Sequence, residues 1–168
     1  MTLAEIDFAS IYRAHLDYVW STLRRLGVAP RDLEDLAHEV FLVVHRRLAD
    51  YDRERPMRPW LFGIAYRIAS DDRKKTARRG PHDDSGDALA SQQPSPEGET
   101  LQREAIGIAQ RALAAIDDEA RAVFILAELD GVAVTEVAET LSIPVNTAYT
   151  RLRRARLAVA SALTGGAA

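Results

Sequence analysis

The 168-residue sequence contains no cysteine. This absence excludes disulfide bonds, thiol nucleophiles, thiolate zinc sites and iron–sulfur clusters, and it agrees with a reducing compartment. The sequence also has no uncharged apolar run of about 18 residues, which is the length that spans a bilayer. Its first seven residues include two acids, whereas a signal peptide has a basic start. We therefore expect a cytoplasmic protein that is not inserted in a membrane.

Residues arranged for catalysis are lacking as well. No serine stands in a nucleophile elbow and there is no glycine-rich phosphate loop, so we expect neither an enzyme nor a cofactor. His38, Glu39 and His45 come nearest to a metal motif, but their two histidines are seven residues apart, whereas those of a zincin are four apart. We therefore predict no catalytic residues and no metal site.

Charge is distributed unevenly along the chain, although the formal net charge is only −3. Residues 80–100 contain five acids, three prolines, three glycines and no Lys or Arg, a composition typical of a solvated linker. The sequence on either side is richer in bases, which cluster near residues 67–79 and 151–156. The composition therefore predicts a domain over residues 1–79, a flexible acidic linker over 80–100 and a second domain over 101–168. Local basic clusters of this kind are compatible with nucleic-acid binding despite the acidic pI.

Apolar residues recur at helical spacing in both domains, and the alternation of a β-strand is missing. In the first domain the pattern predicts a helix over residues 8–26, a second capped by Asp32 with an apolar stripe that runs to Tyr51, and a third over 59–79. In the second domain it predicts helices over residues 105–116, 119–129, 134–141 and 145–163. We therefore predict an all-α protein of two small helical domains, the first a three- or four-helix bundle.

The strongest local pattern is a helix-turn-helix in the second domain. A short helix over residues 131–141 is followed by the breaker Ser142-Ile143-Pro144 and then by a longer helix. The positions of the longer helix that should face inward are Val145, Ala148, Leu152, Ala155 and Val159. Its other face combines short polar groups suited to base edges with guanidinium groups suited to phosphates and guanines. The pattern favours DNA binding over the alternative of a surface helix with a solvated basic face.

Three motifs together resemble one protein family over nearly the whole chain. Residues 130–156 (D-G-V-A-V-T-E-V-A-E-T-L-S-I-P-V-N-T-A-Y-T-R-L-R-R-A-R) are similar to region 4 of bacterial sigma factors of the extracytoplasmic-function (ECF) type. Residues 32–42 (D-L-E-D-L-A-H-E-V-F-L) and 58–65 (R-P-W-L-F-G-I-A) resemble two motifs of region 2 of that family. The resemblance implies a sigma-70 family transcription initiation factor that binds core RNA polymerase and directs it to promoters.

The resemblance also implies partners and site residues. Region 2 would bind the β′ clamp of the polymerase and recognise and melt the −10 element, and region 4 would contact the β flap and read the −35 element as duplex. An anti-sigma factor is a further expected partner. The implied polymerase-binding residues are Asp35, Glu39, Leu42 and Arg46. The implied −10 contacts are Arg58, Trp60, Arg67, Asp71, Arg73, Lys74 and Lys75. The implied −35 contacts are Asn146, Thr147, Tyr149, Thr150, Arg151, Arg153 and Arg154.

Several residues depart from the family motifs. Ala133 stands where a serine would cap the first helix of the helix-turn-helix, a loss of about 1 kcal/mol in typical hosts. Ser142 and Asn146 replace glycines, so we expect some backbone strain at the turn. Tyr149 replaces a usual Lys or Arg, and Arg67 replaces an asparagine, so base specificity does not carry over at these positions.

Two alternatives stay open on the sequence alone. Trp60 is either a base-stacking residue or, as is commoner at the start of a helix, a core residue. The whole chain is either a sigma factor or a free-standing helix-turn-helix regulator that binds operators without polymerase. The motifs of the first domain favour the sigma factor, because an operator-binding dimer has no use for them.

Overall fold

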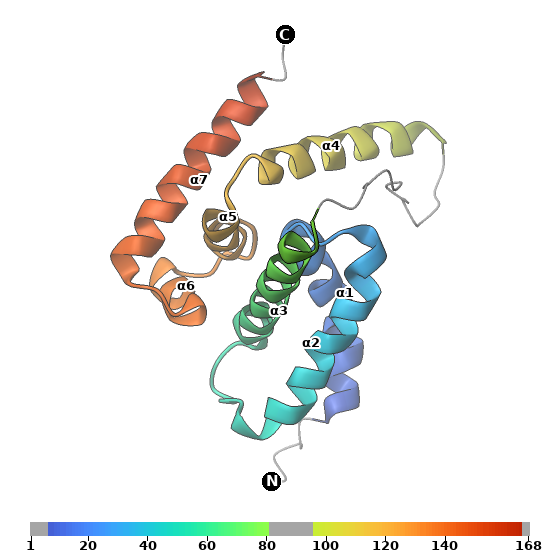
Figure 1. The fold of residues 1–168 in the computed structure, drawn as a ribbon, viewed down its shortest axis with the longest axis vertical. Coiled ribbons are helices and arrows are strands. Elements are labelled where there is room, and N and C mark those ends of the chain that lie inside the picture. The colour runs from blue at the N-terminus through green and yellow to red at the C-terminus, as the bar shows by residue number, and fades with distance from the viewer. Residues whose placement is uncertain (1–6, 81–95, 166–168) are drawn as a thin grey trace. The chain divides into compact units, whose positions relative to one another are not determined.

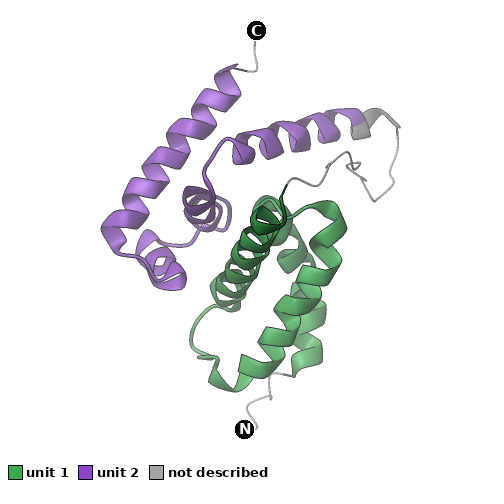
Figure 2. Ribbon diagram, viewed as in Figure 1, with its two compact units in different colours: residues 1–83 green, residues 84–168 purple. Residues whose placement is uncertain are grey.

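The computed structural model describes residues 7–80 and 96–165, without the side chains of residues 96–99. The chain divides into two compact units, residues 1–83 and 84–168, which are described separately below (Figure 2). Every regular element in the described ranges is helical (Figure 1). Most of the predicted linker, residues 81–95, lies outside the described residues.

Unit 1 is a bundle of three long helices. These are α1 (Phe8–Arg25), α2 (Leu33–Arg47) and α3 (Met57–Arg79), with the short 3-10 turns η1 (Pro30–Asp32) and η2 (Leu48–Asp50) on either side of α2. Gly27, at φ 91°, turns the chain after α1, and the amide of Val28 donates to the Leu23 carbonyl at 3.1 Å, which closes the helix end. Asp32 is the N-cap residue of α2, as predicted, but its side chain makes no capping hydrogen bond. The carboxylate lies instead 3.6 Å from the guanidinium of Arg31.

The core of unit 1 is made by one apolar face from each long helix. The largest fully buried apolar side chains here are Val19, Leu23, Leu26, Val40, Val44, Leu61 and Phe62. Burial of this kind contributes roughly 1.5–3 kcal/mol for each large side chain, and it is the main favourable term that packs the three helices together. The opposite faces of α2 and α3 remain in solvent and carry the charged residues.

Unit 2 consists of α4 (Pro96–Ala114), α5 (Asp118–Phe124), η3 (Ile125–Leu129), α6 (Val134–Leu141) and α7 (Val145–Gly165). The helix predicted over residues 119–129 is continuous, but its second half, η3, is a π-helical turn. Helix α4 begins at Pro96, inside the segment predicted to be linker. Asp117 caps α5 by accepting a hydrogen bond from the amide of Ala120 at 3.0 Å.

The core of unit 2 lies between α5, η3, α6 and α7. Its buried side chains include Ile116, Val123, Ile125, Leu126, Val137, Ala148, Leu152 and Ala155. Two of the positions predicted to face inward on α7 are not buried: Val145 is 39% exposed and Val159 is half-buried. Val145 is the first residue of α7 and lies at the edge of the packed surface, so the three-four periodicity overstates its burial.

None of the helices in the described ranges is both long and apolar enough to cross a membrane.

Candidate functional site

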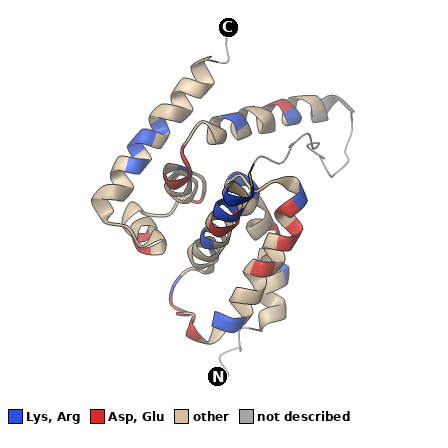
Figure 3. Cartoon of the chain, viewed as in Figure 1, with Lys and Arg blue, Asp and Glu red and all other residues tan. Residues whose placement is uncertain are grey.

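The outward face of α2 presents a stripe of one apolar and three charged residues. Asp35, Glu39, Leu42 and Arg46 follow one another at steps of four, three and four, and all four side chains are exposed. Leu42 is 44% exposed, although leucine is usually buried. Acids lie in the first half of α2 and bases at its end (Figure 3). An exposed leucine ringed by charge suits a protein interface, because the centre can be desolvated while the rim steers the partner.

The connection from α2 to α3 is fixed by aromatic contacts. The ring of Tyr51 lies 4.8 Å from the ring of Trp60, and its hydroxyl donates to the carbonyl of Arg55. Burial and the Asp52 carboxylate raise the pKa of Tyr51. Trp60 is therefore half-buried against the loop, intermediate between the core position and the free stacking residue that the sequence allowed.

The start of α3 is attached to α1. The guanidinium of Arg58 lies over the ring of Tyr18 at 5.2 Å, and the Tyr18 hydroxyl donates to the Arg58 carbonyl at 3.3 Å. His15 lies in the same region, and its Nδ1 atom is buried with no hydrogen-bond partner among the described residues. Burial, together with the positive charge of Arg58, lowers the pKa of His15.

The second half of α3 is strongly basic on its exposed side (Figure 3). Arg67, Asp71 and Lys74 are exposed and follow one another at helical spacing, with Lys75 exposed beside them. Arg73 is half-buried. The structure thus brings four of the predicted −10 residues onto the solvent side of one helix, and two others, Arg58 and Trp60, lie at its N-terminal end. A basic helix face of this kind can attract a phosphate backbone.

The turn between α6 and α7 carries the strain that the sequence predicted. Ser142 has φ 55° and ψ 46°, and it is the only residue other than glycine with positive φ in the described ranges. The amide of Ile143 donates to the Ala138 carbonyl at 3.0 Å, so the turn closes α6 in the usual way despite the serine. Ala133 occupies the N-cap of α6 and provides no side-chain cap.

The outermost face of α7 carries Asn146, Tyr149, Thr150 and Arg153, all exposed. Tyr149 is 54% exposed. The hydroxyl of Thr150 donates to the Asn146 carbonyl at 2.9 Å, so its donor is occupied within the helix. Thr147, also a predicted contact, is half-buried at the side of this face. The structure therefore groups these side chains on one solvent-facing helix surface.

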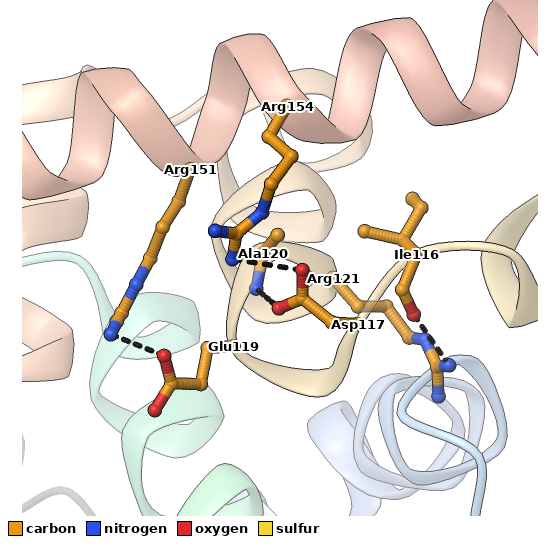
Figure 4. Close-up of polar contacts among 7 residues, drawn as sticks. All are labelled: Ile116, Asp117, Glu119, Ala120, Arg121, Arg151 and Arg154. Carbon is orange, nitrogen blue, oxygen red and sulfur yellow. Dashed lines mark hydrogen bonds and ion pairs between the residues drawn. The ribbon is translucent and has the colours of Figure 1, made fainter.

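The remaining arginines of α7 are paired with acids from the start of α5 and from η3. Arg151 Nη2 lies 2.5 Å from Glu119 Oε2. Arg154 Nη2 lies 2.8 Å from Asp117 Oδ2, and Figure 4 shows both arginine side chains directed from α7 toward these acids. Arg156 Nη2 lies 2.5 Å from Glu128 Oε1 in η3.

These acids could not be read from the pattern of α7, because no acid follows Glu139 in the sequence and the partners come from about 30 residues earlier in the chain. Asp117 has two roles, since it caps α5 and accepts from Arg154. Partial burial alone would raise the pKa of Asp117, but the Ala120 amide and the guanidinium groups of Arg154 and Arg151 hold it below its usual value.

Arg121 is a further residue that the sequence pattern did not single out. It donates to the carbonyl of Leu113 at 2.8 Å and to that of Ile116 at 2.9 Å, and so ties the end of α4 to α5. Figure 4 shows the contact with Ile116. Its side chain is only 12% exposed, so it is a structural arginine.

The histidine spacing on α2 came nearest to a metal motif in the sequence. His38 and His45 are exposed, and the ring of His45 packs edge-on against Phe8 at 5.0 Å. No group of three potential ligands that could hold a metal ion occurs in the part of the chain that the structure describes.

Comparison with known proteins gives a consistent result for the two units. A family model described as Sigma-70 region 2 matches residues 11–79, and one described as Sigma-70, region 4 matches residues 106–159. The ECF RNA polymerase sigma-E factor of Escherichia coli K12 is 30% identical over 138 residues, which cover 76% of this chain and 72% of that protein. RNA polymerase sigma factor NccH of Alcaligenes xylosoxydans xylosoxydans is 28% identical over 153 residues, covering 89% and 82%.

Two solved structures share the fold. One is CnrH in complex with the cytosolic domain of CnrY, with a TM-score of 0.66, 23% identity and coverage of 96% of this chain and 89% of that one. The other is the sigma factor RpoE in complex with the anti-sigma factor NepR from Bartonella quintana, with a TM-score of 0.74, 18% identity and coverage of 94% and 97%.

Proposed function

The chain belongs to the sigma-70 family as an ECF sigma factor with regions 2 and 4, which directs RNA polymerase to promoters, and we propose that three of its surfaces divide this task. Sigma factors are not enzymes, so the chain supplies binding while the polymerase supplies the chemistry. The observation that carries the proposal is the presence of both regions in family order, each with an exposed face of suitable chemistry. The domain limits 1–79 and 101–168, the linker 80–100 and a cytoplasmic location are parts of the same proposal.

The first surface is the α2 stripe, made of Asp35, Glu39, Leu42 and Arg46. We assign it to the β′ clamp of the polymerase. Its exposed leucine supports this role, because moving that apolar side chain from water into an interface would favour binding. The surrounding charges would set orientation and association rate. For the β flap we assign unit 2, whose α4 and α7 expose Leu101, Ile106 and Leu157.

The second surface is the loop after α2 together with α3, assigned to the −10 element. Arg58 and Trp60 lie where the loop joins the helix, and Arg67, Asp71, Arg73, Lys74 and Lys75 follow along it. Melting a duplex costs the stacking and pairing of its bases. Aromatic side chains can stack on the unpaired bases, and basic side chains can bind the phosphates of the single strand. The contact of Tyr51 with Trp60 supports this role, because it holds the indole beside the loop and only half-buried.

The third surface is α7, assigned to the −35 element as duplex. Asn146, Tyr149, Thr150 and Arg153 form its outermost face, with Thr147, Arg151 and Arg154 at its sides. Amide and guanidinium groups of this kind pair with adenine and guanine edges in the major groove, and a helix is narrow enough to enter it.

We also propose an anti-sigma partner. Both solved structures are complexes with a second protein, and for RpoE that protein is an anti-sigma factor. A partner that covers the α2 stripe would block polymerase binding, so the same exposed leucine that serves the clamp would be the target.

Co-elution with core polymerase tests the proposal. The purified chain is mixed with bacterial core RNA polymerase, separated by size exclusion, and the complex is used for run-off transcription on fragmented genomic DNA. We expect co-elution and discrete start sites that share two upstream elements. A chain that stays off the polymerase but still retards particular duplexes would instead be a free-standing regulator, an alternative that leaves the match of residues 11–79 to region 2 unexplained.

A further inference from the structure

The arginines of α7 fall into two groups by their surroundings. Arg151, Arg154 and Arg156 each pair with a carboxylate at 2.5–2.8 Å. Arg153, in contrast, has no ion pair within the ranges that the structure describes; its side chain is exposed, as are those of Arg154 and Arg156. The partners are Asp117, Glu119 and Glu128, which come from the start of α5 and from η3; we call these three residues the acidic brace.

Two features of the brace favour the paired state of its arginines. The side chain of Arg151 is only 19% exposed, so its guanidinium is less open to solvent than those of Arg154 and Arg156, which are 55% and 61% exposed. Asp117 is itself fixed, because its other carboxylate oxygen caps α5 at the Ala120 amide. In Figure 4 the two pairs lie side by side between α7 and the start of α5.

Exposed ion pairs of this kind contribute little to stability, about 0–1 kcal/mol each. Their effect on DNA binding is different, because a phosphate competes with the carboxylate for the same guanidinium. A free arginine binds phosphates of any sequence, and each such contact adds about 0.9 to the slope of log affinity against log salt. A paired arginine adds this contact only if its acid is displaced.

We propose that the acidic brace makes promoter recognition more selective: Asp117, Glu119 and Glu128 are positioning residues that orient Arg151, Arg154 and Arg156 and suppress their binding to phosphates of any sequence. This inference rests on the proposed role of α7 at the −35 element. With three arginines neutralised, the outermost face keeps Asn146, Tyr149 and one unpaired cation, Arg153, for contact with DNA. Binding then depends more on base edges and less on charge.

The test uses Glu119→Gln and Asp117→Asn, which remove the charge but keep a hydrogen-bond acceptor. Asparagine is also as good an N-cap as aspartate, so α5 stays capped. The matched control is Glu104→Gln, which removes the same charge from an exposed position of α4. Each variant is assembled with core polymerase and tested on a promoter identified with the wild-type holoenzyme and on the same promoter with its −35 element scrambled.

We expect the two brace variants to occupy the scrambled promoter several-fold more than wild type, with a salt slope steeper by about 0.9 for each freed arginine. The ratio of transcripts from the intact promoter to those from the scrambled promoter should fall about threefold or more. This is somewhat less than the discrimination that one specific contact between a side chain and a base provides. Adding Glu119→Gln to Arg151→Gln should change neither quantity, because the guanidinium that it would release is gone.

Two results would overturn the inference. In one, both brace variants match wild type and Glu104→Gln in slope and ratio. In the other, both brace variants raise occupancy of the intact and the scrambled promoter by the same factor. The acids would then act only by repelling DNA through their negative charge, and they would not position the arginines. Failure of the wild-type holoenzyme to give discrete start sites would contradict the proposed function itself, and it is seen before any variant is made.

Discussion

At the turn between α6 and α7, Ser142 has the left-handed conformation that glycine adopts at lower cost. The family motif has glycine at this position, so the strain was predictable from the sequence. At the other end of α6, Ala133 provides no side-chain cap. This too was predictable, because the family motif has a serine there. Both residues lie in the helix-turn-helix, so we expect this motif to be less stable here than it would be with the family's glycine and serine at these positions.

Replacing Ser142 by glycine should stabilise unit 2 by about 1 kcal/mol, because the left-handed strain of an L-residue exceeds the entropy that glycine loses on folding. The measurement is urea denaturation of the full chain followed by circular dichroism. Ser161→Gly, at an exposed position in the body of α7, is the matched control and should destabilise the chain, since glycine is a poor helix former. Equal shifts of the same sign in the two variants would contradict the assigned strain.

His15 makes the stability of unit 1 depend on pH. Burial and the charge of Arg58 lower the pKa of this histidine, so the fold favours the neutral ring. The resulting stability is present above the unfolded pKa of about 6.5 and is lost as the pH falls through the lower folded pKa.

We therefore expect the urea midpoint of the wild type to drop between pH 7.5 and 5.5 by more than that of His15→Gln. His38→Gln, which removes a histidine from the exposed side of α2, serves as the matched control. An unchanged pH dependence in His15→Gln would assign the effect to another group.

At the scale of elements, the helices with strong apolar periodicity were predictable to within a few residues. The predicted range 8–26 compares with α1 at Phe8–Arg25, and 134–141 coincides with α6. The π turn of η3 was not predictable, because the same apolar spacing fits an α-helix and a π-helix over one turn. The start of α4 at Pro96 was also missed, because the polar composition there hides a helix.

The surface of α7 shows why the candidate site was only partly predictable. Its outward residues follow from helical spacing alone, and the structure groups Asn146, Tyr149 and Arg153 as expected. The pairing of Arg151 with Glu119 follows from tertiary packing of α5 on α7, and a periodicity within one helix carries no information about it. Long-range polar contacts of this kind are therefore the part of the site that the sequence leaves open.

On α2, the exposed stripe gives a direct prediction. Glu39→Arg or Leu42→Asp should weaken binding to core polymerase tenfold or more, or about 1.4 kcal/mol, because one reverses a rim charge and the other places a charge at the apolar centre. Helix content should stay the same, since both side chains are exposed.

Binding is measured by titration of labelled core polymerase with each variant. Glu34→Arg, on the same helix but off the stripe, is the control for Glu39→Arg and should bind like wild type. Equal weakening by Glu34→Arg would show that the net charge of α2 matters and the stripe does not.

At the scale of the whole molecule, each unit has its own core and carries its own exposed basic helix, α3 in unit 1 and α7 in unit 2. Under the proposed function, two DNA-binding units joined by a chain segment would suit two separate promoter elements. Linking them also makes the second contact intramolecular, so that modest affinities combine. The negative net charge of the chain is compatible with DNA binding, because phosphates respond to the local basic faces of α3 and α7 more than to the net charge.

The most direct test of this account is transcription by core polymerase with the chain from one identified promoter, in which the −10 and the −35 element are scrambled in turn. The account predicts a discrete transcript from the intact promoter and a large loss, about tenfold or more, when either element is scrambled, since each mismatched base pair alone typically costs about 1–3 kcal/mol. A transcript that depends on only one element, or that is unchanged when the chain is omitted, would contradict the claim that both units direct the polymerase to promoters.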